Sequence, residues 1–449
     1  APDVDIYAYR ALGPGGRGTT EQIIAAIDRA IEDQVDILNL SLGVSINGPD
    51  LPASKALDQA VKKGIIAVTS NGNSGPDIWT VGSPGTSGKA ISVGASTPLI
   101  SIPYLEYKGE KFQLLPLASS KKWRNGESFF LSDGIEGKKE EIKNSHGKLV
   151  LIKRGDITFT EKVENAVLAG AKAVIIYNNS EGEFLVELEK EFDIPIALLK
   201  KNDGERLLKL LNPKVPAKIH LEKEADRLAD FSSRGPVTHT WDIKPDLVAP
   251  GVAIISTVPG GYLALQGTSM ASPHVTGASA LLKQAHPEWT PEQIKAVLMN
   301  TSKRLKGKKR EYYPYEQGAG RIQLDKALAT NSIIRPASLL FGQTDGEAFL
   351  ETEKTIIVEN VGSKPLRYTF RQAKRSELIN WHFPPPFYLN PGETRKVPIK
   401  MEVKKDHDEN KIFHGYIELE AGNENIALPY LYVTKEPDYP RIMSFVMLE

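Results

Sequence analysis

Ser269 stands in the sequence setting of a reactive serine. It lies in the stretch 267–277 (GTSMASPHVTG), where small residues let a backbone and a substrate approach it closely. An apolar, small-residue helix is predicted to begin here, with Pro273 in the first turn, which tolerates proline because that N–H has no partner. A serine at a helix start meets the positive end of the helix dipole, which favours developing negative charge. The alternative interpretation is a buried Gly/Ser-rich helix start without chemistry.

A serine hydroxyl is a poor nucleophile and needs a histidine base that a carboxylate holds in place. His274 lies five residues after Ser269 on the same predicted helix, and this spacing points it away from the serine. We predict none of the sequence's histidines as the base. The eight histidines are His146, His220, His239, His274, His286, His382, His407 and His414.

Asn73 is the second candidate for chemistry. It lies in the glycine-rich run 71–75 (NGNSG), directly after a predicted buried strand. Its side-chain amide can donate hydrogen bonds to the oxyanion that forms when a serine attacks a carbonyl. Asparagine between glycines is also a common turn residue, and the residues alone leave that interpretation open.

Four stretches resemble, in the right order, the motifs of the subtilisin-like serine peptidases. They are 36–43 (DILNLSLG), 70–76 (SNGNSGP), 231–236 (FSSRGP) with 244–251 (KPDLVAPG), and the Ser269 stretch. The resemblance implies a serine endopeptidase that acts through an acyl-enzyme on Ser269, with Asn73 in the oxyanion hole. The family's catalytic Asp and His stand in Asp-Thr/Ser-Gly and His-Gly-Thr-His settings, and neither occurs in this sequence. We therefore expect both on a segment before residue 1, and expect this chain to be inactive alone.

The resemblance also implies where a peptide substrate would bind. Its backbone is expected to lie between the segments 16–18 and 41–43 and to pair as an added strand with the glycine-rich segment 13–18. Gly82, in the stretch 80–85 (TVGSPG), is expected to leave the primary specificity pocket open for bulky apolar side chains. The predicted substrate-binding residues are Gly16, Arg17, Gly18, Ser41, Leu42, Gly43, Gly72 and Gly82.

Composition limits the class of protein. The 449 residues hold 56 basic and 56 acidic side chains, and this balance argues against nucleic acid or an acidic membrane as the main partner. No apolar run approaches the ~18 residues that a membrane helix needs. The absence of cysteine excludes disulfides, thiolate metal sites and a cysteine nucleophile. The partner expected is a protein or peptide substrate, and the resemblance implies a secreted, bacterial enzyme.

Strands alternate with helices in the first hundred residues. Thr19 and Gln22 form a capping-box pattern at the start of a helix, and Thr290 with Gln293 forms another. Such alternation predicts an α/β fold with a mostly parallel sheet and helices on both faces, whose ligands bind at the carboxyl ends of the strands. The strands expected are 4–12, 37–42, 64–70 and 90–95, with a helix at 53–63.

The peptidase pattern stops near Leu99 and resumes near Ala229. The interval has its own strand, helix and strand pattern and resembles a protease-associated domain, an α+β insert. From Ser332 onward, short strands between turns predict a β-sandwich, which is similar to the fibronectin-III-like domain of larger family members. The predicted domains are therefore 1–99 and 229–331 for the peptidase, 100–228 for the insert and 332–449 for the sandwich.

Two other functions stay open from the sequence. The same domains could form a non-catalytic binding or structural protein, although a pure binder needs neither Ser269 nor Asn73. An α/β-hydrolase is a weaker alternative, because residues 267–271 lack the final glycine of Gly-x-Ser-x-Gly. The chemistry requires no cofactor. A structural calcium is compatible with the resemblance but is assigned to no residues, and the run 406–410 (DHDEN) is interpreted as a solvated loop.

Overall fold

The computed structural model separates the chain into two compact units. Unit 1 comprises Ala1–Ser96, Asp226–Val252 and Gln266–Glu449, and unit 2 comprises Thr97–Ala225 and Ala253–Leu265. The sequence-based domain boundaries stay a prediction, and residues 253–265, predicted within 229–331, cluster with unit 2 instead. The residues that the structure describes are 3–98, 100–117, 120–180, 188–224, 226–307, 310–344, 350–371, 379–403 and 411–434.

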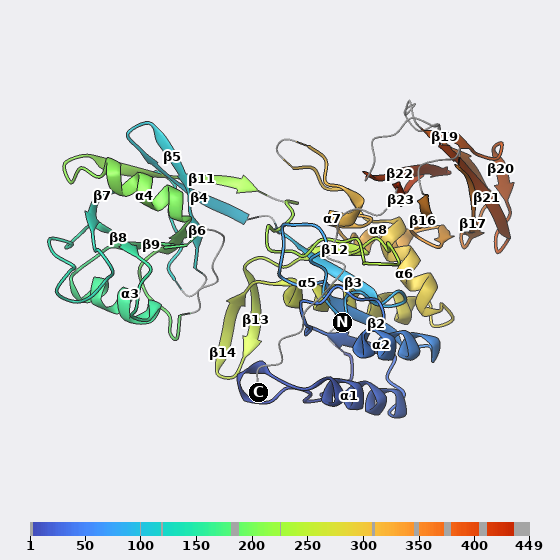
Figure 1. The fold of residues 1–449 in the computed structure, drawn as a ribbon, viewed down its shortest axis with the longest axis horizontal. Coiled ribbons are helices and arrows are strands. Elements are labelled where there is room, and N and C mark those ends of the chain that lie inside the picture. The colour runs from blue at the N-terminus through green and yellow to red at the C-terminus, as the bar shows by residue number, and fades with distance from the viewer. Residues whose placement is uncertain are drawn as a thin grey trace. The chain divides into compact units, whose positions relative to one another are not determined.

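A four-stranded parallel sheet forms the centre of the first part of unit 1 (Figure 1). Its order is β1-β2-β3-β12, and every neighbouring pair runs parallel. The predicted α/β sheet is therefore confirmed. The strands are β1 (Ile37–Leu40), β2 (Ile66–Ser70), β3 (Ile91–Ser96) and β12 (Leu247–Pro250).

Helices cover both faces of this sheet. The helices α1 (Thr20–Glu32) and α2 (Pro52–Lys62) bury one face with Ile27 and Leu57. The helices α5 (Thr268–Ala285) and α6 (Pro291–Asn300) bury the other through a core that includes Val275 and Val297. Both predicted capping boxes are present, one at Thr19 and one at Thr290, and they explain why α1 and α6 begin where they do. The short elements of this part are η1 (Pro14–Gly16), α7 (Pro314–Gln317) and α8 (Leu324–Ala329).

The strand predicted over 4–12 is wrong. Its residues form no strand, and Val4, Ile6 and Tyr7 are exposed. Alternation supplies only the side-chain pattern of a strand, whereas the strand itself needs a hydrogen-bonded neighbour. Within the described part of the chain, no strand pairs with this segment.

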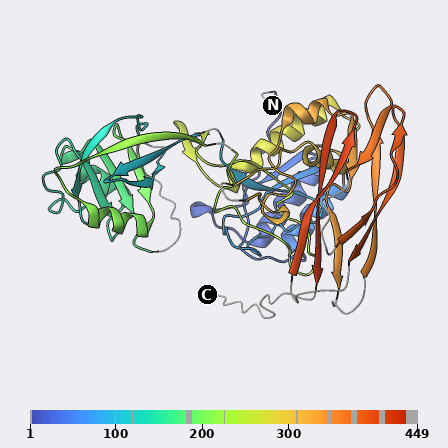
Figure 2. The same cartoon turned by 90° about the horizontal axis from the view of Figure 1, so that it is seen from above.

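Two sheets around one hydrophobic core form the last part of unit 1 (Figure 2). Their orders are β15-β17-β21-β19 and β16-β23-β22-β18-β20, and alternate residues such as Val397, Ile399 and Met401 point into the core. The strands are β15 (Ser332–Arg335), β16 (Leu339–Thr344), β17 (Leu350–Asn360), β18 (Leu366–Phe370), β19 (Ile379–His382), β20 (Phe387–Leu389), β21 (Thr394–Val403), β22 (Lys411–Ala421) and β23 (Glu424–Thr434).

Unit 2 is built on an eight-stranded mixed sheet in the order β5-β4-β11-β7-β8-β9-β10-β6. The four strands from β7 to β10 run parallel, and a separate hairpin is formed by β13 (Ile254–Val258) and β14 (Gly261–Leu265). The other elements are β4 (Ile100–Tyr107), β5 (Glu110–Gln113), β6 (Leu115–Pro116), β7 (Ser128–Asp133), β8 (Leu149–Lys153), α3 (Phe159–Leu168), β9 (Ala173–Tyr177), β10 (Ile196–Leu199), α4 (Lys201–Leu210) and β11 (Pro216–Glu224). None of the helices in the described ranges combines the length and apolar character that crossing a membrane demands.

Candidate active site

The structure places Ser269 at the start of α5, half-buried, beside the carboxyl ends of β1 and β2. The helix begins at Thr268, with Gly267 as its N-cap at a φ of 148°, a conformation that favours glycine. The Gly267 N–H donates to the carbonyl of Gly251 at 2.8 Å, which ties the helix start to the end of β12. The Ser269 N–H is among the first four of α5, which have no acceptor within a helix.

Pro273 lies inside α5, so its predicted placement in the first turn is wrong. A proline there cannot donate to the carbonyl four residues earlier, which belongs to Ser269. The structure supplies another donor, because the Ser41 hydroxyl donates to the Ser269 carbonyl at 2.8 Å. The helix therefore tolerates the proline by a hydrogen bond from the loop after β1.

The hydroxyl of Ser269 donates to the Ser41 carbonyl at 3.1 Å, so the two serines are joined twice. No histidine or carboxylate in the described ranges hydrogen-bonds to Ser269. His274 is exposed, and its Nδ1 lies 2.9 Å from the Met270 carbonyl. The expectation that His274 points away from Ser269 agrees with this contact.

Asn73 lies in the loop after β2 and is held by the first residue of α5. Its Oδ1 accepts from the Thr268 N–H and from the Thr268 hydroxyl, each at 2.9 Å. The Thr268 hydroxyl in turn accepts from the Gly72 N–H at 3.3 Å. These bonds fix the orientation of the amide and leave its Nδ2 without a hydrogen bond to the described part of the protein.

The stretch 231–236 shapes the loop that carries Asn73. Asn71 donates to the Ser233 carbonyl at 2.6 Å, and the Ser74 N–H donates to the Ser233 hydroxyl at 3.0 Å. Arg234 is buried, and burial lowers the pKa of its guanidinium although nearby carboxylates oppose the shift. The guanidinium donates to the carbonyls of Ala229 and Glu316, so this motif acts as a scaffold for the loop.

Gly82 lies in close contact with a neighbouring backbone segment, and the expected role of this glycine in a specificity pocket stays a prediction. A Cβ built on Gly82 would lie 2.3 Å from the Val44 carbonyl oxygen, and one on Gly43 would lie 2.6 Å from the Ser83 carbonyl oxygen. The Val44 N–H also donates to the Ser83 carbonyl at 2.8 Å. The two glycines therefore allow these two backbone segments to approach each other closely.

The structure brings several of the predicted residues together. Ser41 is hydrogen-bonded to Ser269, and Gly72 and Asn73 are both hydrogen-bonded to Thr268. Gly43 packs against the loop that carries Gly82. Leu42, which lies between Ser41 and Gly43 in the sequence, is half-buried. Gly16 is the last residue of η1, and Arg17 and Gly18 follow it, before the N-cap of α1. A Cβ on Gly18 would lie 2.6 Å from the Ala11 carbonyl oxygen, so this glycine also serves a close backbone approach.

Asn39 was not predicted from the sequence. Its Oδ1 accepts from the Ser272 hydroxyl at 2.7 Å and from the Thr276 hydroxyl at 3.0 Å, and its Nδ2 donates to the Ser41 hydroxyl at 3.2 Å. The available sequence signal was its polarity within the otherwise apolar strand β1 (ILNL).

The described residues contain no group of three or more His, Asp or Glu side chains placed to hold a metal ion. The run 406–410, interpreted from the sequence as a solvated loop, lies outside the described residues. The expectation of a structural calcium therefore stays an unassigned prediction.

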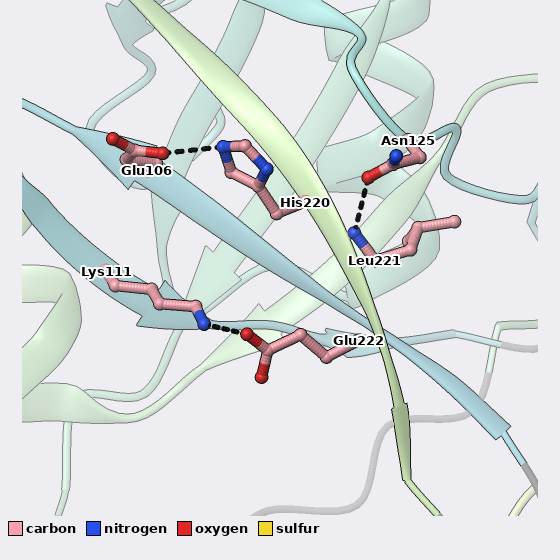
Figure 3. A pocket seen from close by; sticks show the side chains of 6 residues that line it. All are labelled: Glu106, Lys111, Asn125, His220, Leu221 and Glu222. Carbon is pink, nitrogen blue, oxygen red and sulfur yellow. Dashed lines mark hydrogen bonds and ion pairs between the residues drawn. The ribbon is translucent and has the colours of Figure 1, made fainter.

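A cavity of about 460 Å³ lies in unit 2 on the strands β4, β5 and β11 (Figure 3). Glu106 faces His220 at 2.6 Å, and Lys111 pairs with Glu222, so its charged side chains are matched with one another. The third contact is internal too, because the Leu221 N–H donates to Asn125. None of the residues predicted for catalysis or substrate binding lines this cavity.

A family model and the relatives found by sequence show which family the chain belongs to. The model described as "Subtilase family" (peptidase S8) matches residues 1–320. The minor extracellular protease Vpr of Bacillus subtilis (strain 168) is 42% identical over 468 residues, with 100% of this chain and 58% of that protein covered. A C5a peptidase of Streptococcus pyogenes serotype M6 is 29% identical, with 78% of this chain and 33% of that protein covered. The subtilisin-like protease SBT5.4 of Arabidopsis thaliana is 31% identical, with 73% and 48% covered.

Proposed function

This chain belongs to the subtilase family, and from that premise we propose that it carries the nucleophile and the oxyanion site of a serine endopeptidase that cleaves proteins. The chain spans 58% or less of the length of the three relatives described above, so the activity of the whole protein is part of the proposal. The partner proposed is a protein or peptide substrate. Secretion from a bacterial cell is proposed by analogy with the extracellular protease Vpr.

The pairing of Thr268 with Asn73 carries the proposal. Thr268 precedes the proposed nucleophile, and its N–H and hydroxyl both hold Asn73 Oδ1, so Nδ2 is turned out as a free donor beside the helix start. A donor that is already oriented costs no reorganisation when charge develops in the transition state. The Ser269 N–H, which has no helical acceptor, can supply a second donor.

The proposed reaction begins when a histidine from outside this sequence takes the Ser269 proton. The oxygen then attacks the peptide carbonyl, and the tetrahedral oxyanion accepts hydrogen bonds from Asn73 Nδ2 and the Ser269 N–H. When it collapses, the protonated histidine gives its proton to the leaving amine, and an acyl-enzyme remains, which water hydrolyses. The Ser41 carbonyl, which receives the Ser269 hydroxyl in this structure, becomes free to accept an N–H of the substrate.

The substrate backbone is proposed to lie between the segments 16–18 and 41–43 as an added strand. This proposal rests on the position of 41–43 directly after β1, at the carboxyl edge of the parallel sheet, where ligands of such folds bind. The preference for a bulky apolar side chain toward Gly82 is kept as part of the proposal, although a Cβ on Gly82 would meet the Val44 carbonyl oxygen.

Ser269→Ala and Asn73→Leu in the complete gene product test the proposed function. We expect Ser269→Ala to abolish peptide hydrolysis and Asn73→Leu to lower kcat by about 10²–10³ with little change in KM. That magnitude is borrowed from subtilisin itself, the standard example of an oxyanion-hole asparagine. Ser302→Ala is the matched control, because within the described residues its hydroxyl donates to the Leu298 carbonyl of α6 and not to the proposed site.

Three outcomes would contradict this assignment. Hydrolysis that survives Ser269→Ala would remove Ser269 as the nucleophile, and a wild-type protein without hydrolysis would favour the binding-protein alternative. A raised KM with unchanged kcat in Asn73→Leu would make Asn73 a ground-state binding residue. Asn73→Asp separates folding from catalysis, because it keeps the acceptor for Thr268 and removes the donor.

We also propose that unit 2 is a protease-associated insert and that the sandwich is of the fibronectin-III-like kind. The α+β character of unit 2 and the two sheets around one core support these assignments. A role in shaping substrate access is proposed for the insert. Expression of residues 100–228 alone is expected to give a cooperative melting curve, and a featureless one would contradict an independent domain.

A further inference from the structure

We infer that Asn39 is a positioning residue for Ser269, which it holds through the hydroxyl of Ser41. The inference rests on the proposed function, because it assigns a new role at the same site. Asn39 donates to the Ser41 hydroxyl at 3.2 Å, and that hydroxyl donates to the Ser269 carbonyl at 2.8 Å. A continuous hydrogen-bond path therefore joins β1 to the backbone of the proposed nucleophile.

The face of α5 that meets Asn39 carries hydroxyl groups rather than apolar side chains. Ser269, Ser272 and Thr276 stand at i, i+3 and i+7, so they lie on one face of the helix. The hydroxyls of Ser272 and Thr276 both donate to Asn39 Oδ1, at 2.7 and 3.0 Å. The amide is thus held on its oxygen side by two turns of α5, which leaves its nitrogen directed at Ser41.

The position of Asn39 in β1 argues against a role in packing. Leu38 and Leu40 point into the core with α1 and α2, and Ile37 packs against the core that contains α5. Asn39 shares the α5 side with Ile37, and an apolar residue there would extend that core. Instead the strand carries at this position a polar side chain that is exposed and makes three hydrogen bonds.

Pro273 explains why the path is needed. Because a proline has no N–H, the Ser269 carbonyl loses the donor that a helix would normally provide. The Ser41 hydroxyl replaces that donor, and Asn39 fixes the direction in which this hydroxyl points. A small displacement of a reacting group lowers the rate of a catalysed reaction strongly. Removing a hydrogen bond of this path should therefore lower the rate of the chemical step.

A double-mutant cycle in the complete gene product tests the inference. The variants are Asn39→Asp, Ser41→Ala and the double variant. Asn39→Asp keeps an oxygen that accepts from the hydroxyls of α5 and removes the N–H that donates to Ser41. Measured on the high-pH plateau of kcat, each single variant is expected to lower kcat about tenfold with little change in KM. The double variant is expected to lose about tenfold rather than the hundredfold of independent effects, because both changes break one path.

Ser279→Ala is the matched control, since it removes a buried hydroxyl bond on the same helix, to the Val275 carbonyl, without touching the path. If Asn39→Asp folds poorly, the neutral and similarly sized Asn39→Leu replaces it in the cycle. The inference would be wrong, with the proposed function unaffected, if Asn39 variants had the same kcat as Ser279→Ala. The same holds if the losses of kcat in the two single variants added up in the double variant. A wild-type protein without Ser269-dependent turnover would overturn the proposed function and, with it, the inference.

Discussion

Asp246→Asn removes a negative charge that lies between two lysines in the core of unit 1. The Asp246 carboxylate accepts from Lys244 at 2.7 Å, from Lys295 at 2.8 Å and from the Ser92 N–H at 2.8 Å. Burial raises the pKa of Asp246, but the two lysine charges outweigh it and hold the pKa below its usual value. The group is therefore ionised in the folded protein, and the variant removes its charge while keeping its shape.

The expected loss follows from the burial of the three partners. The side chains of Asp246 and Lys244 are 4% and 2% exposed, and that of Lys295 is 16% exposed. Breaking a buried ion pair from one side costs about 3–5 kcal/mol, because the remaining charge has neither water nor a counter-charge. Lys295 can still reach some water and asparagine keeps one acceptor, so we expect about 3 kcal/mol at pH 7.

The loss of stability caused by Asp246→Asn should become smaller as the pH rises from 7 to 8. Burial lowers the pKa of Lys295 to about 8 despite the attraction of Asp246, and removing that attraction lowers the pKa further. Near pH 7.5, Lys295 has therefore lost its proton in the folded variant but keeps it in the unfolded variant, so the free energy of unfolding of the variant rises with pH. In the folded wild type, Lys295 keeps its proton until about pH 8, so the wild type gains less over this interval. The difference in the free energy of unfolding between the wild type and Asp246→Asn is expected to narrow by up to about 1.4 kcal/mol between pH 7 and pH 8.

Urea unfolding of the 449-residue chain, followed by circular dichroism at pH 7 and pH 8, measures both effects. Asp50→Asn is the control, because its pair with Lys55 is exposed and should contribute less than about 1 kcal/mol. A loss below about 1 kcal/mol for Asp246→Asn, or a difference that widens toward pH 8, would refute the reasoning.

Three further outcomes are expected. Burial lowers the pKa of His414 to about 4 where its ring packs on Tyr313. The stability of the wild type should therefore fall as the pH drops from 6.5 to 4, and thermal melts of His414→Phe should lack this decline. Gly82→Ala should lower the free energy of unfolding by about 1–3 kcal/mol, because its Cβ would meet the Val44 carbonyl oxygen; an unchanged urea midpoint would contradict that contact. The purified 449-residue chain should not hydrolyse a fluorogenic peptide, since no described histidine bonds to Ser269, and turnover lost in Ser269→Ala would show that a base lies within the chain.

Much of the fold could be predicted because its determinants are short stretches of sequence. The capping boxes at Thr19 and Thr290, the apolar strands that became β1 to β3, and the helix pattern of α3 each depend on residues within about one element length. The order of strands and helices then restricted the sheet to a parallel arrangement, with Ser41 and Asn73 at one edge. These features follow from local propensity, which the sequence carries directly.

The tertiary structure alone decided how the candidate site is held together. Asn73 and Thr268 are 195 positions apart, and Ser41 and Ser269 are 228 apart, so no local pattern predicts their hydrogen bonds. The segment 4–12 has the alternation of a strand but no partner, and the space beside Gly82 is filled by a distant carbonyl. Each of these outcomes depends on which groups packing brings within about 3 Å, and hydrogen-bond partners and steric contacts at that range are set by the folded chain rather than by its sequence periodicity.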